Sequence, residues 1–343
     1  MITLLHGAKK NVGDFLIYNR CRNLASHFLK HDDFLVYERW KPLDDHIADI
    51  NKTDGIVLCG GPLFSRNMYP ANMPFVSRIE DIKVPVVPVG IGWYNKKNFS
   101  FEKFRFNTNT LKFIRQIHSM INCSGVRCPD TLAILKKHGI DNALLTGCPA
   151  LYDLKSMGKP LQASGQINRI VVSDPADLML YPKVIGLIRR IKRLFAGAEI
   201  NLCFHRGIQP DIYTSMRNSL SARILKAMAK SYGCLVHDVS SNTDNIEFYR
   251  ECDLHIGFRV HAHVFFASIR KPTFLLQEDG RGIGMSKLMG VGDVNARKSN
   301  AAAEIMDRVE QSVEVGFRNF SHIPDLIDKK FLTMKKVFMR SFG

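Results

Sequence analysis

The sequence predicts an α/β protein made of two Rossmann-like domains that face each other across a cleft. Short apolar runs alternate with amphipathic helical patterns along the whole chain, which is typical of parallel sheets covered by helices. The alternation lapses at residues 154–168 (LKSMGKPLQASGQIN), where Gly, Pro, Ser and Gln gather as in a linker. The length of 343 residues also fits two domains, at roughly 100–200 residues each.

The first half, residues 1–155, is assigned to an N-terminal domain because its apolar runs are short, strand-like and separated by helical patterns. The predicted strands are Ile2–His6, Phe34–Tyr37, Gly55–Cys59, Val84–Val89, Met120–Ser124 and Ala143–Thr146. The predicted helices include Asp14–Leu29 and Pro129–His138.

The second half, residues 168–320, repeats the pattern without repeating the residues, and is assigned to a second domain. Its predicted strands are Ile170–Ser173, Ala198–Phe204, Cys234–His237, Asp253–Ile256 and Thr273–Leu276. Its predicted helices are Pro182–Phe195, Ser215–Tyr232, Asn245–Arg250 and Arg259–Ile269. Ligands of such sheets bind beyond the carboxyl ends of the strands, so the functional residues are sought there.

The C-terminal segment, 321–343, is predicted to form a separate basic amphipathic helix, because basic pairs alternate with apolar residues over 325–343. Two interpretations remain open for it. The helix packs on a domain with a solvated basic edge, or it lies on an anionic membrane surface. A second basic helix, Lys183–Arg193, contains no acidic residue and leaves the same two interpretations open.

The composition narrows the classes of partner. With 48 basic and 32 acidic residues the net charge is +16, which favours anionic ligands. Nucleic acid is excluded as a partner, because zinc-finger spacing and RNP-like aromatic motifs are absent and the basic residues are spread along the chain. The 8 cysteines form no CxxC pair and are interpreted as buried, reduced thiols.

The chain is expected in the cytoplasm, where the basic helices would add a peripheral contact at the inner membrane face. Its N-terminus, MITLLHGAKKNVGD, lacks the basic start and apolar stretch of a signal peptide and is interpreted as a first strand. Its apolar runs are far shorter than the roughly 20 residues that a membrane-spanning helix needs.

Two kinds of turn in the first half are candidates for ligand contacts. The turn Gly7–Asp14 leads into a helix, where Asp14 is a candidate N-cap and backbone amides could hold an anion or sugar hydroxyls. Glycine pairs at two predicted strand ends allow a ligand to approach the backbone. These candidate acceptor- or anion-binding residues are Asn11, Gly13, Asp14, Gly60, Gly61, Gly90 and Gly92.

Arginine and histidine side chains follow two later strands. Arg127 comes just past a strand and before the helix that Pro129 opens, so it is either a fork for a carboxylate or phosphate or a surface ion-pair partner. In the stretch HIGFRVHAH, Arg259 and His261 fall in the first turn of a helix, where arginine would hold an anion and histidine would exchange a proton. His255 is predicted as a strand residue and His263 as a packed helix residue. Without a neighbouring carboxylate or cysteine ligand, no metal site is predicted.

These motifs together resemble the polysaccharide pyruvyltransferase family over roughly residues 1–290. The most specific piece is the Arg-x-His-Ala turn at Arg259, in order after the N-terminal motifs. The chain departs from the family pattern at Pro62, where a third glycine is common, and at Cys128, where aspartate is common. The motifs that carry the resemblance are Asn11-Val12-Gly13-Asp14, Gly60-Gly61, Gly90-Ile91-Gly92, Val126-Arg127 and Asp253-Leu254-His255-Ile256-Gly257-Phe258-Arg259-Val260-His261-Ala262.

The resemblance implies a GT-B-like pair of domains, with the acceptor on the N-terminal side and the donor on the C-terminal side. It implies transfer of pyruvate from phosphoenolpyruvate onto two hydroxyls of one sugar in a cell-surface polysaccharide (an exopolysaccharide) or a lipid-linked precursor, giving a cyclic ketal. Arg127 and Arg259 would hold the donor's carboxylate and phosphate, and His261 would transfer the proton. Arg281 and Lys287 would complete the set of residues that bind the donor. Lys287 would stand for a lysine that commonly follows the last motif of the family. No cofactor is implied.

Two other functions remain open at this stage. A glycosyltransferase could use the same two-domain cleft for a nucleotide sugar, with Arg259 and Arg281 on the diphosphate and Glu278 or Asp279 on a ribose or acting as a base. A ligand-binding or regulatory protein without catalysis could use the same arrangement of charges.

Overall fold

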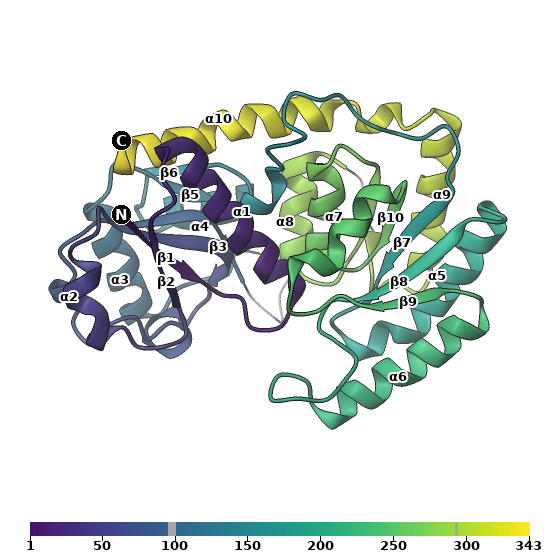
Figure 1. Cartoon of the computed structure of the whole chain (residues 1–343), viewed down its shortest axis with the longest axis horizontal. Helices are drawn as coiled ribbons and strands as arrows, with labels where there is room; N and C mark the ends of the chain where they lie inside the picture. Colours follow the sequence, from purple (N-terminus) through teal and green to yellow (C-terminus); the bar gives the residue numbers. More distant parts are fainter. Residues whose placement is uncertain (95–100, 292–293) are drawn as a thin grey trace.

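Two parallel β-sheets flanked by helices form the fold of the computed structural model, which describes residues 1–94, 101–291 and 294–343 (Figure 1). The strands of the first sheet run in the order β2-β1-β3-β4-β5-β6, and those of the second in the order β12-β11-β10-β7-β8-β9. All strand pairs in both sheets are parallel. Together with the intervening helices, the two sheets confirm the prediction of two Rossmann-like α/β domains.

The N-terminal domain follows the predicted alternation closely. Its strands are β1 (Ile2–His6), β2 (Phe34–Glu38), β3 (Ile56–Phe64), β4 (Val86–Trp93), β5 (Ser124–Val126) and β6 (Ala143–Leu145). Its helices are α1 (Val12–Leu29), α2 (Ile47–Ile50), α3 (Thr108–Ser119) and α4 (Pro129–Lys137), with short helical turns η1 (Asp44–His46), η2 (Met68–Asn72), η3 (Ile79–Asp81) and η4 (Pro149–Leu151). Side chains alternate between the faces of the buried sheet: Leu4 belongs to one apolar cluster and Leu5 to the other.

The second domain begins after residues 154–168, which contain no helix or strand. Its strands are β7 (Arg169–Ser173), β8 (Glu199–Phe204), β9 (Leu235–Asp238), β10 (Leu254–Gly257), β11 (Thr273–Gln277) and β12 (Val294–Asn295). Its helices are α5 (Tyr181–Leu194), α6 (Met216–Ser231), α7 (Val260–Ser268), α8 (Gly280–Met289) and α9 (Ala301–Glu314), with short turns η5 (Leu178–Leu180), η6 (Thr243–Glu251) and η7 (Arg318–Phe320). A last helix, α10, spans His322–Phe342.

The strand order of each sheet indicates where a ligand is expected to bind. The second sheet, read as β9-β8-β7-β10-β11-β12, has the Rossmann order, and its direction of winding reverses between β7 and β10. The first sheet reverses between β1 and β3. The loops beyond the carboxyl ends of these four strands are therefore the expected ligand-binding loops.

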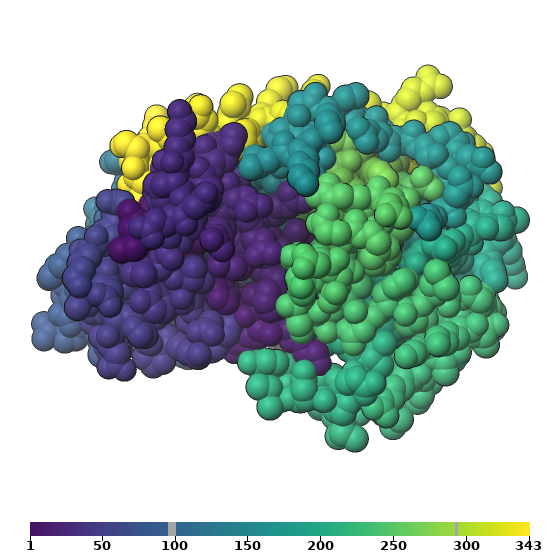
Figure 2. Space-filling model, viewed as in Figure 1, coloured from purple at the N-terminus to yellow at the C-terminus, as the bar shows by residue number. Residues whose placement is uncertain are grey.

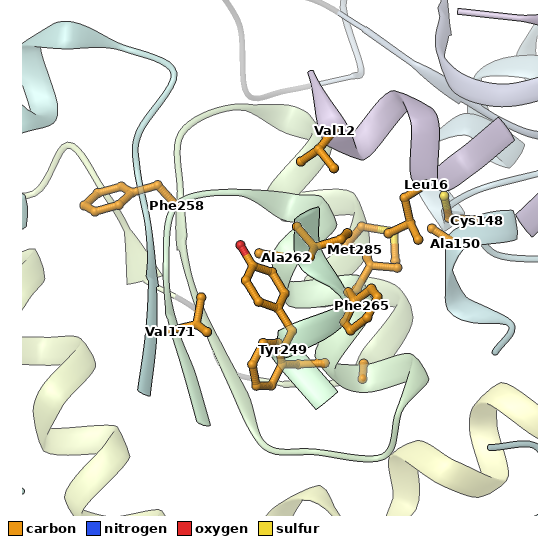
Figure 3. Close-up of a cluster of buried hydrophobic side chains, with 14 of the residues drawn as sticks. Val12, Leu16, Cys148, Ala150, Val171, Tyr249, Phe258, Ala262, Phe265 and Met285 are labelled. Atoms are coloured by element: carbon orange, nitrogen blue, oxygen red, sulfur yellow. The ribbon is translucent and has the colours of Figure 1, made fainter. Parts of the chain in front are cut away.

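An apolar cluster joins the two domains. Val12 and Leu16 of α1 belong to the same buried cluster as Ala262 and Phe265 of α7 and Met285 of α8 (Figure 3). The N-terminal segment, purple in Figure 2, lies in contact with the green second domain. Since the start of α1 packs directly on α7, the geometry between the domains depends on these two helices.

Helix α10 packs with its apolar side on the rest of the protein, which agrees with the interpretation of the C-terminal segment as a helix packed on a domain. It returns from the second domain to the first and contacts α1, β4, β5, β6 and α7 (Figure 1). Its buried residues include Ile327, Met334 and Phe338. None of the helices that the structure describes is long and apolar enough to span a bilayer.

Some boundaries differ from the prediction. Helix α1 begins at Val12 after Asn11, so Asp14 is not the N-cap but stands in the first turn. Strands β3 and β4 continue through their glycine pairs, where Gly60, Gly61 and Gly90 adopt left-handed φ and the register shifts between Gly61 and Phe64. Strand β5 starts at Ser124, where the predicted strand ended. Helices α3, α8 and α9 were not predicted. All 8 cysteines are buried and free, as predicted.

Candidate functional site

A polar cavity lies between the two domains, beyond the carboxyl ends of their strands. The N-terminal domain contributes Asn11 and Arg127. The second domain contributes the other lining residues, which are His205, Arg206, Phe258, Arg259, Val260, His261, Glu278, Asp279 and Arg281. Four arginines in one small cavity make it a candidate site for a compact polyanion.

The N-termini of three helices add to the positive electrostatic potential that the arginines create in the cavity. Asn11 precedes α1, Arg259 precedes α7, and Asp279 precedes α8, so three helices begin at the cavity wall. The first amides of a helix have no partner within the helix and carry partial positive charge. At α8 the side chain of Asp279 accepts a hydrogen bond from the Arg281 amide, whereas α1 and α7 have no side-chain cap. The starts of α1 and α7 are thus suited to an anionic ligand.

Arg127 is the least compensated charge in the cavity. Its side chain is 1% exposed, and Nε, Nη1 and Nη2 all lack a hydrogen-bond partner among the described residues. A Cβ on Gly92 would lie 2.5 Å from Arg127 Nη2, so the bare backbone of β4 makes room for the guanidinium. A buried charge without partners costs several kcal/mol, which makes Arg127 a candidate contact for an anionic ligand. The surface ion-pair interpretation of Arg127 is wrong, because the residue is buried.

Arg259 and Arg281 are each held on one edge by an aspartate. Arg259 donates from Nε to Asp174 Oδ1 (2.8 Å) and from Nη2 to Asp174 Oδ2 (2.6 Å). Arg281 donates from Nε and Nη2 to Asp279 Oδ2 (2.9 and 2.6 Å), and its guanidinium stacks over the Tyr94 ring at 5.4 Å. The Nη1 atoms of Arg259 and Arg281 have no hydrogen bond to a described residue. Each of these arginines is therefore fixed in place with one nitrogen available to a ligand.

His261 lies in the first turn of α7 and is buried, with no hydrogen-bond partner for Nε2 among the residues that the structure describes. Its ring packs against the backbone of α1, where a Cβ on Gly13 would lie 2.2 Å from Nδ1. Burial first, and then the charges of Arg127 and Arg281, lower the pKa of His261 well below its ordinary value. Among these arginines, and without a bound anion, the ring is therefore neutral at pH 7.

The other predicted residues divide into two groups. Asn11 lines the cavity and donates from Nδ2 to Asp14 Oδ2 (3.1 Å). The remaining glycines serve packing, since a Cβ on Gly60 would meet Ile17, one on Gly61 would meet Arg39, and one on Gly90 would meet Pro149.

Lys287 stands apart from the cavity, contrary to its expected donor role. It pairs with Asp130 at 2.7 Å and lies 5.2 Å from the Phe101 ring, so it links α8 to the N-terminal domain instead. His255 and His263 are a buried strand residue and a buried helix residue, as predicted, and both contact Thr273 Oγ1.

Several site residues were missed in the sequence. Asp174 follows β7, and His205 and Arg206 follow β8. His205 is buried beside Arg259, and burial lowers its pKa well below the ordinary value. The signal available was the position of polar residues directly after predicted strands. No cluster of three His, Cys, Asp or Glu side chains fit for a metal occurs in the described ranges.

Comparisons with known proteins give the family and the fold of the chain. A family model described as polysaccharide pyruvyl transferase matches residues 11–280. In fold, the chain is similar to a UDP-GlcNAc 2-epimerase from Neisseria meningitidis bound to UDP-GlcNAc (TM-score 0.56, 11% identity, 99% of this chain and 100% of that chain). It is also similar to S. aureus MnaA in complex with UDP (TM-score 0.56, 10% identity, 98% and 93%). These similarities place the fold among GT-B-like folds. No curated protein sequence matches the chain.

Proposed function

Because the chain belongs to the polysaccharide pyruvyl transferase family, we propose that it moves pyruvate from phosphoenolpyruvate onto a sugar of a cell-surface polysaccharide or of its lipid-linked precursor. The observation that carries the proposal is the buried guanidinium of Arg127, whose three nitrogens have no partner among the described residues, in the same cavity as His261. The site acts in the cytoplasm and needs no cofactor.

The charges of the cavity suit this donor. Phosphoenolpyruvate carries a carboxylate and a phosphate, with up to three negative charges on a small molecule. Arg127 offers a whole guanidinium fork, while Arg259 and Arg281 each offer one nitrogen in a fixed position. Arg206 stands at the cavity wall and adds a fourth cation. A donor bound there also removes the cost of keeping Arg127 unpaired.

The reaction needs one proton delivery and two additions. The methylene carbon of the donor takes a proton, and the neighbouring carbon becomes an oxocarbenium-like centre that a sugar hydroxyl attacks. The bond from that carbon to the phosphate oxygen then breaks as a second hydroxyl of the same sugar adds. Of the two hydroxyl protons, one replaces the proton given to the methylene and the other leaves with the phosphate.

His261 is the proposed proton donor, and the donor molecule itself supplies the reason for its protonation. The arginines that lower the pKa of His261 become neutralised when a polyanion binds between them, and the anion adds an attractive charge. Binding therefore raises the pKa and loads the ring with a proton. A positioned general acid of this kind contributes roughly 10²–10⁴-fold to the rate.

The nucleotide-sugar alternative has less support from the same residues. Glu278 accepts hydrogen bonds from the amides of Ala176 and Asp177, and Asp279 caps α8 and holds Arg281. Both carboxylates that would bind a ribose or act as a base are thus already engaged.

The test is phosphate release from phosphoenolpyruvate in the presence of candidate saccharides, with donor binding measured separately by calorimetry. We expect His261→Ala to bind the donor and nearly abolish turnover, and Arg259→Lys to weaken donor binding, since an ammonium cannot replace the fork. Stabilisation by UDP-, GDP- or CMP-sugars, with none by phosphoenolpyruvate, would favour the glycosyltransferase. Stabilisation by neither donor class would favour a non-catalytic protein.

A further inference from the structure

Helix α6 carries a stripe of exposed apolar side chains along its whole length. Met216, Leu220, Ile224 and Met228 are spaced four residues apart and are 72%, 62%, 54% and 44% exposed. Residues four apart lie on one face of a helix. The loop before the helix adds Ile212 and Tyr213, which are 89% and 51% exposed. A contiguous apolar surface of this kind marks an interaction site.

The stripe is not needed for the packing of the helix itself. A different face of α6, with Ala222, Leu225 and Ala229, is buried against the domain. Between α6 and the start of α5, an open groove has an apolar lining that includes Leu178, Tyr181 and Met228. Figure 1 shows α6 at the edge of the second domain, away from α10. The stripe and the groove thus form one apolar surface, which we call the α6 surface.

Helix α6 carries charges of one sign, and the two aspartates beside the α6 surface, Asp177 and Asp211, are paired with Arg297 and Lys10. Helix α6 contains Arg217, Arg223, Lys226 and Lys230 and no acidic residue, and none of these four forms an ion pair with a described residue. The end of α5 adds two more cations, because Arg189 donates to Tyr232 Oη (2.7 Å) and Lys192 to the Tyr232 carbonyl (2.6 Å) just after α6.

We propose that the α6 surface docks on the surface of an anionic phospholipid membrane. An apolar stripe bordered by Lys and Arg is the pattern of a helix that lies in the membrane interface. Each basic residue near an anionic leaflet contributes about 1 kcal/mol to binding. A symmetric contact with a second copy would bring the same cations of both copies together, which disfavours self-association.

The docking site is connected to the cavity through one loop. The chain from His205 and Arg206 at the cavity wall runs through Ile212 and Tyr213 into α6. Lys10 of the N-terminal domain fixes this loop, with Nζ 2.7 Å from Asp211 Oδ2 and 2.7 Å from Thr214 Oγ1. Docking would therefore hold the cavity close to the bilayer, where the sugar of a lipid-linked acceptor lies. This last step rests on the proposed function, whereas membrane docking does not.

The test is co-sedimentation of the full chain with phosphatidylcholine vesicles, with and without phosphatidylglycerol. The wild type should bind only the anionic vesicles, and less as salt rises. Leu220→Gln with Ile224→Gln should weaken binding by roughly tenfold or more, since two apolar side chains no longer enter the interface. The matched control is Leu332→Gln with Met339→Gln, which removes exposed apolar residues of the basic helix α10 (59% and 42% exposed) and should leave binding unchanged.

Four outcomes would overturn the proposal: no binding by the wild type, equal binding by the α6 variant, loss of binding in the α10 variant, or a wild-type dimer that the α6 variant converts to monomer. Donor binding to each variant, measured by calorimetry without vesicles, separates this proposal from the proposed function. The α6 variant should bind phosphoenolpyruvate like the wild type, because its two positions do not line the cavity.

Discussion

At the scale of single residues, the arginines of the cavity differ in how their charges are compensated. Arg259 has Asp174 and Arg281 has Asp279, whereas Arg127 is buried without a hydrogen bond to a described residue. A paired buried charge and an unpaired one respond in opposite ways to truncation. This difference in the stability of the truncated variants can be measured in the protein without any ligand.

Arg127→Met should raise the free energy of unfolding by about 1–3 kcal/mol, because the variant no longer buries an unsatisfied charge. The same variant should lose phosphoenolpyruvate binding. Guanidinium denaturation and calorimetry measure the two effects. Arg259→Met is the matched control: it leaves Asp174 buried without its partner and should destabilise the fold by about 3–5 kcal/mol. Equal destabilisation by both substitutions would mean that Arg127 is a structural residue.

Sequence reasoning found the arginines and the histidine of the cavity better than the carboxylate that holds Arg259. Arg127, Arg259 and His261 were predictable because each stands directly after a strand or in the first helical turn beyond it. Asp174 was not found, although it also follows a strand, because its role depends on β7 and β10 being neighbours in the sheet. The hydrogen bond between Asp174 and Arg259 joins residues that are 85 positions apart in the chain. Lys287 was misassigned because sequence order does not show that α8 faces α4.

At the scale of elements, the strands and helices were predicted better than the role of the glycines between them. Most strands and long helices were predicted within a few residues, because their apolar periodicity is strong. The glycine pairs were read as strand ends, yet β3 and β4 continue through them with a left-handed backbone. Sequence alone does not reveal that a glycine gives space to a side chain from elsewhere, as Gly92 does for Arg127 and Gly13 for His261.

Gly13→Ala should impair catalysis more than folding. The new Cβ would meet the His261 ring at 2.2 Å, so either the ring moves or α1 separates from α7. A displacement of about 1 Å at a reacting group costs roughly 10²-fold in rate. Steady-state kinetics and a thermal melt measure the two effects.

Gly186→Ala is the matched control for Gly13→Ala. It lies inside α5 with nothing within 4 Å of the new Cβ, and should add about 0.5–1 kcal/mol of stability with unchanged kinetics. Wild-type turnover in Gly13→Ala would show that the contact between Gly13 and His261 is not needed for activity.

At the scale of the whole molecule, the two domains are joined by more than the linker. Asp153, just before the linker, accepts hydrogen bonds from Arg20 of α1 and Arg250 of η6 and is buried. Helix α10 packs across both domains, and the apolar cluster of Figure 3 continues from α1 into α7. The sequence predicted two domains from its alternation. It could not predict how they meet, because these contacts join residues far apart in the chain.

Buried imidazoles in both domains make the stability of the molecule sensitive to acid. Burial lowers the pKa values of His118, His205, His255, His261 and His263, the last to about 3, and the neighbouring arginines act further on His261. These rings stay neutral in the folded protein, while in the unfolded chain they take protons at about pH 6.5. The unfolded state then binds more protons, so stability is full above pH 6.5 and is lost as the pH falls below it.

Each such imidazole lowers the free energy of unfolding by about 1.4 kcal/mol per pH unit below about pH 6.5, down to its folded pKa. Guanidinium denaturation at several pH values between about 7.5 and 5.5 measures the slope, in the window above the unfolded carboxylate pKa values near 4. His261→Gln should make the slope shallower by about one proton. Phosphoenolpyruvate should also make this slope shallower for the wild type, because a bound polyanion lets His261 keep its proton in the folded state. A stability independent of pH over this range would mean that the buried rings are protonated in the native protein, and that His261 is charged before any donor binds.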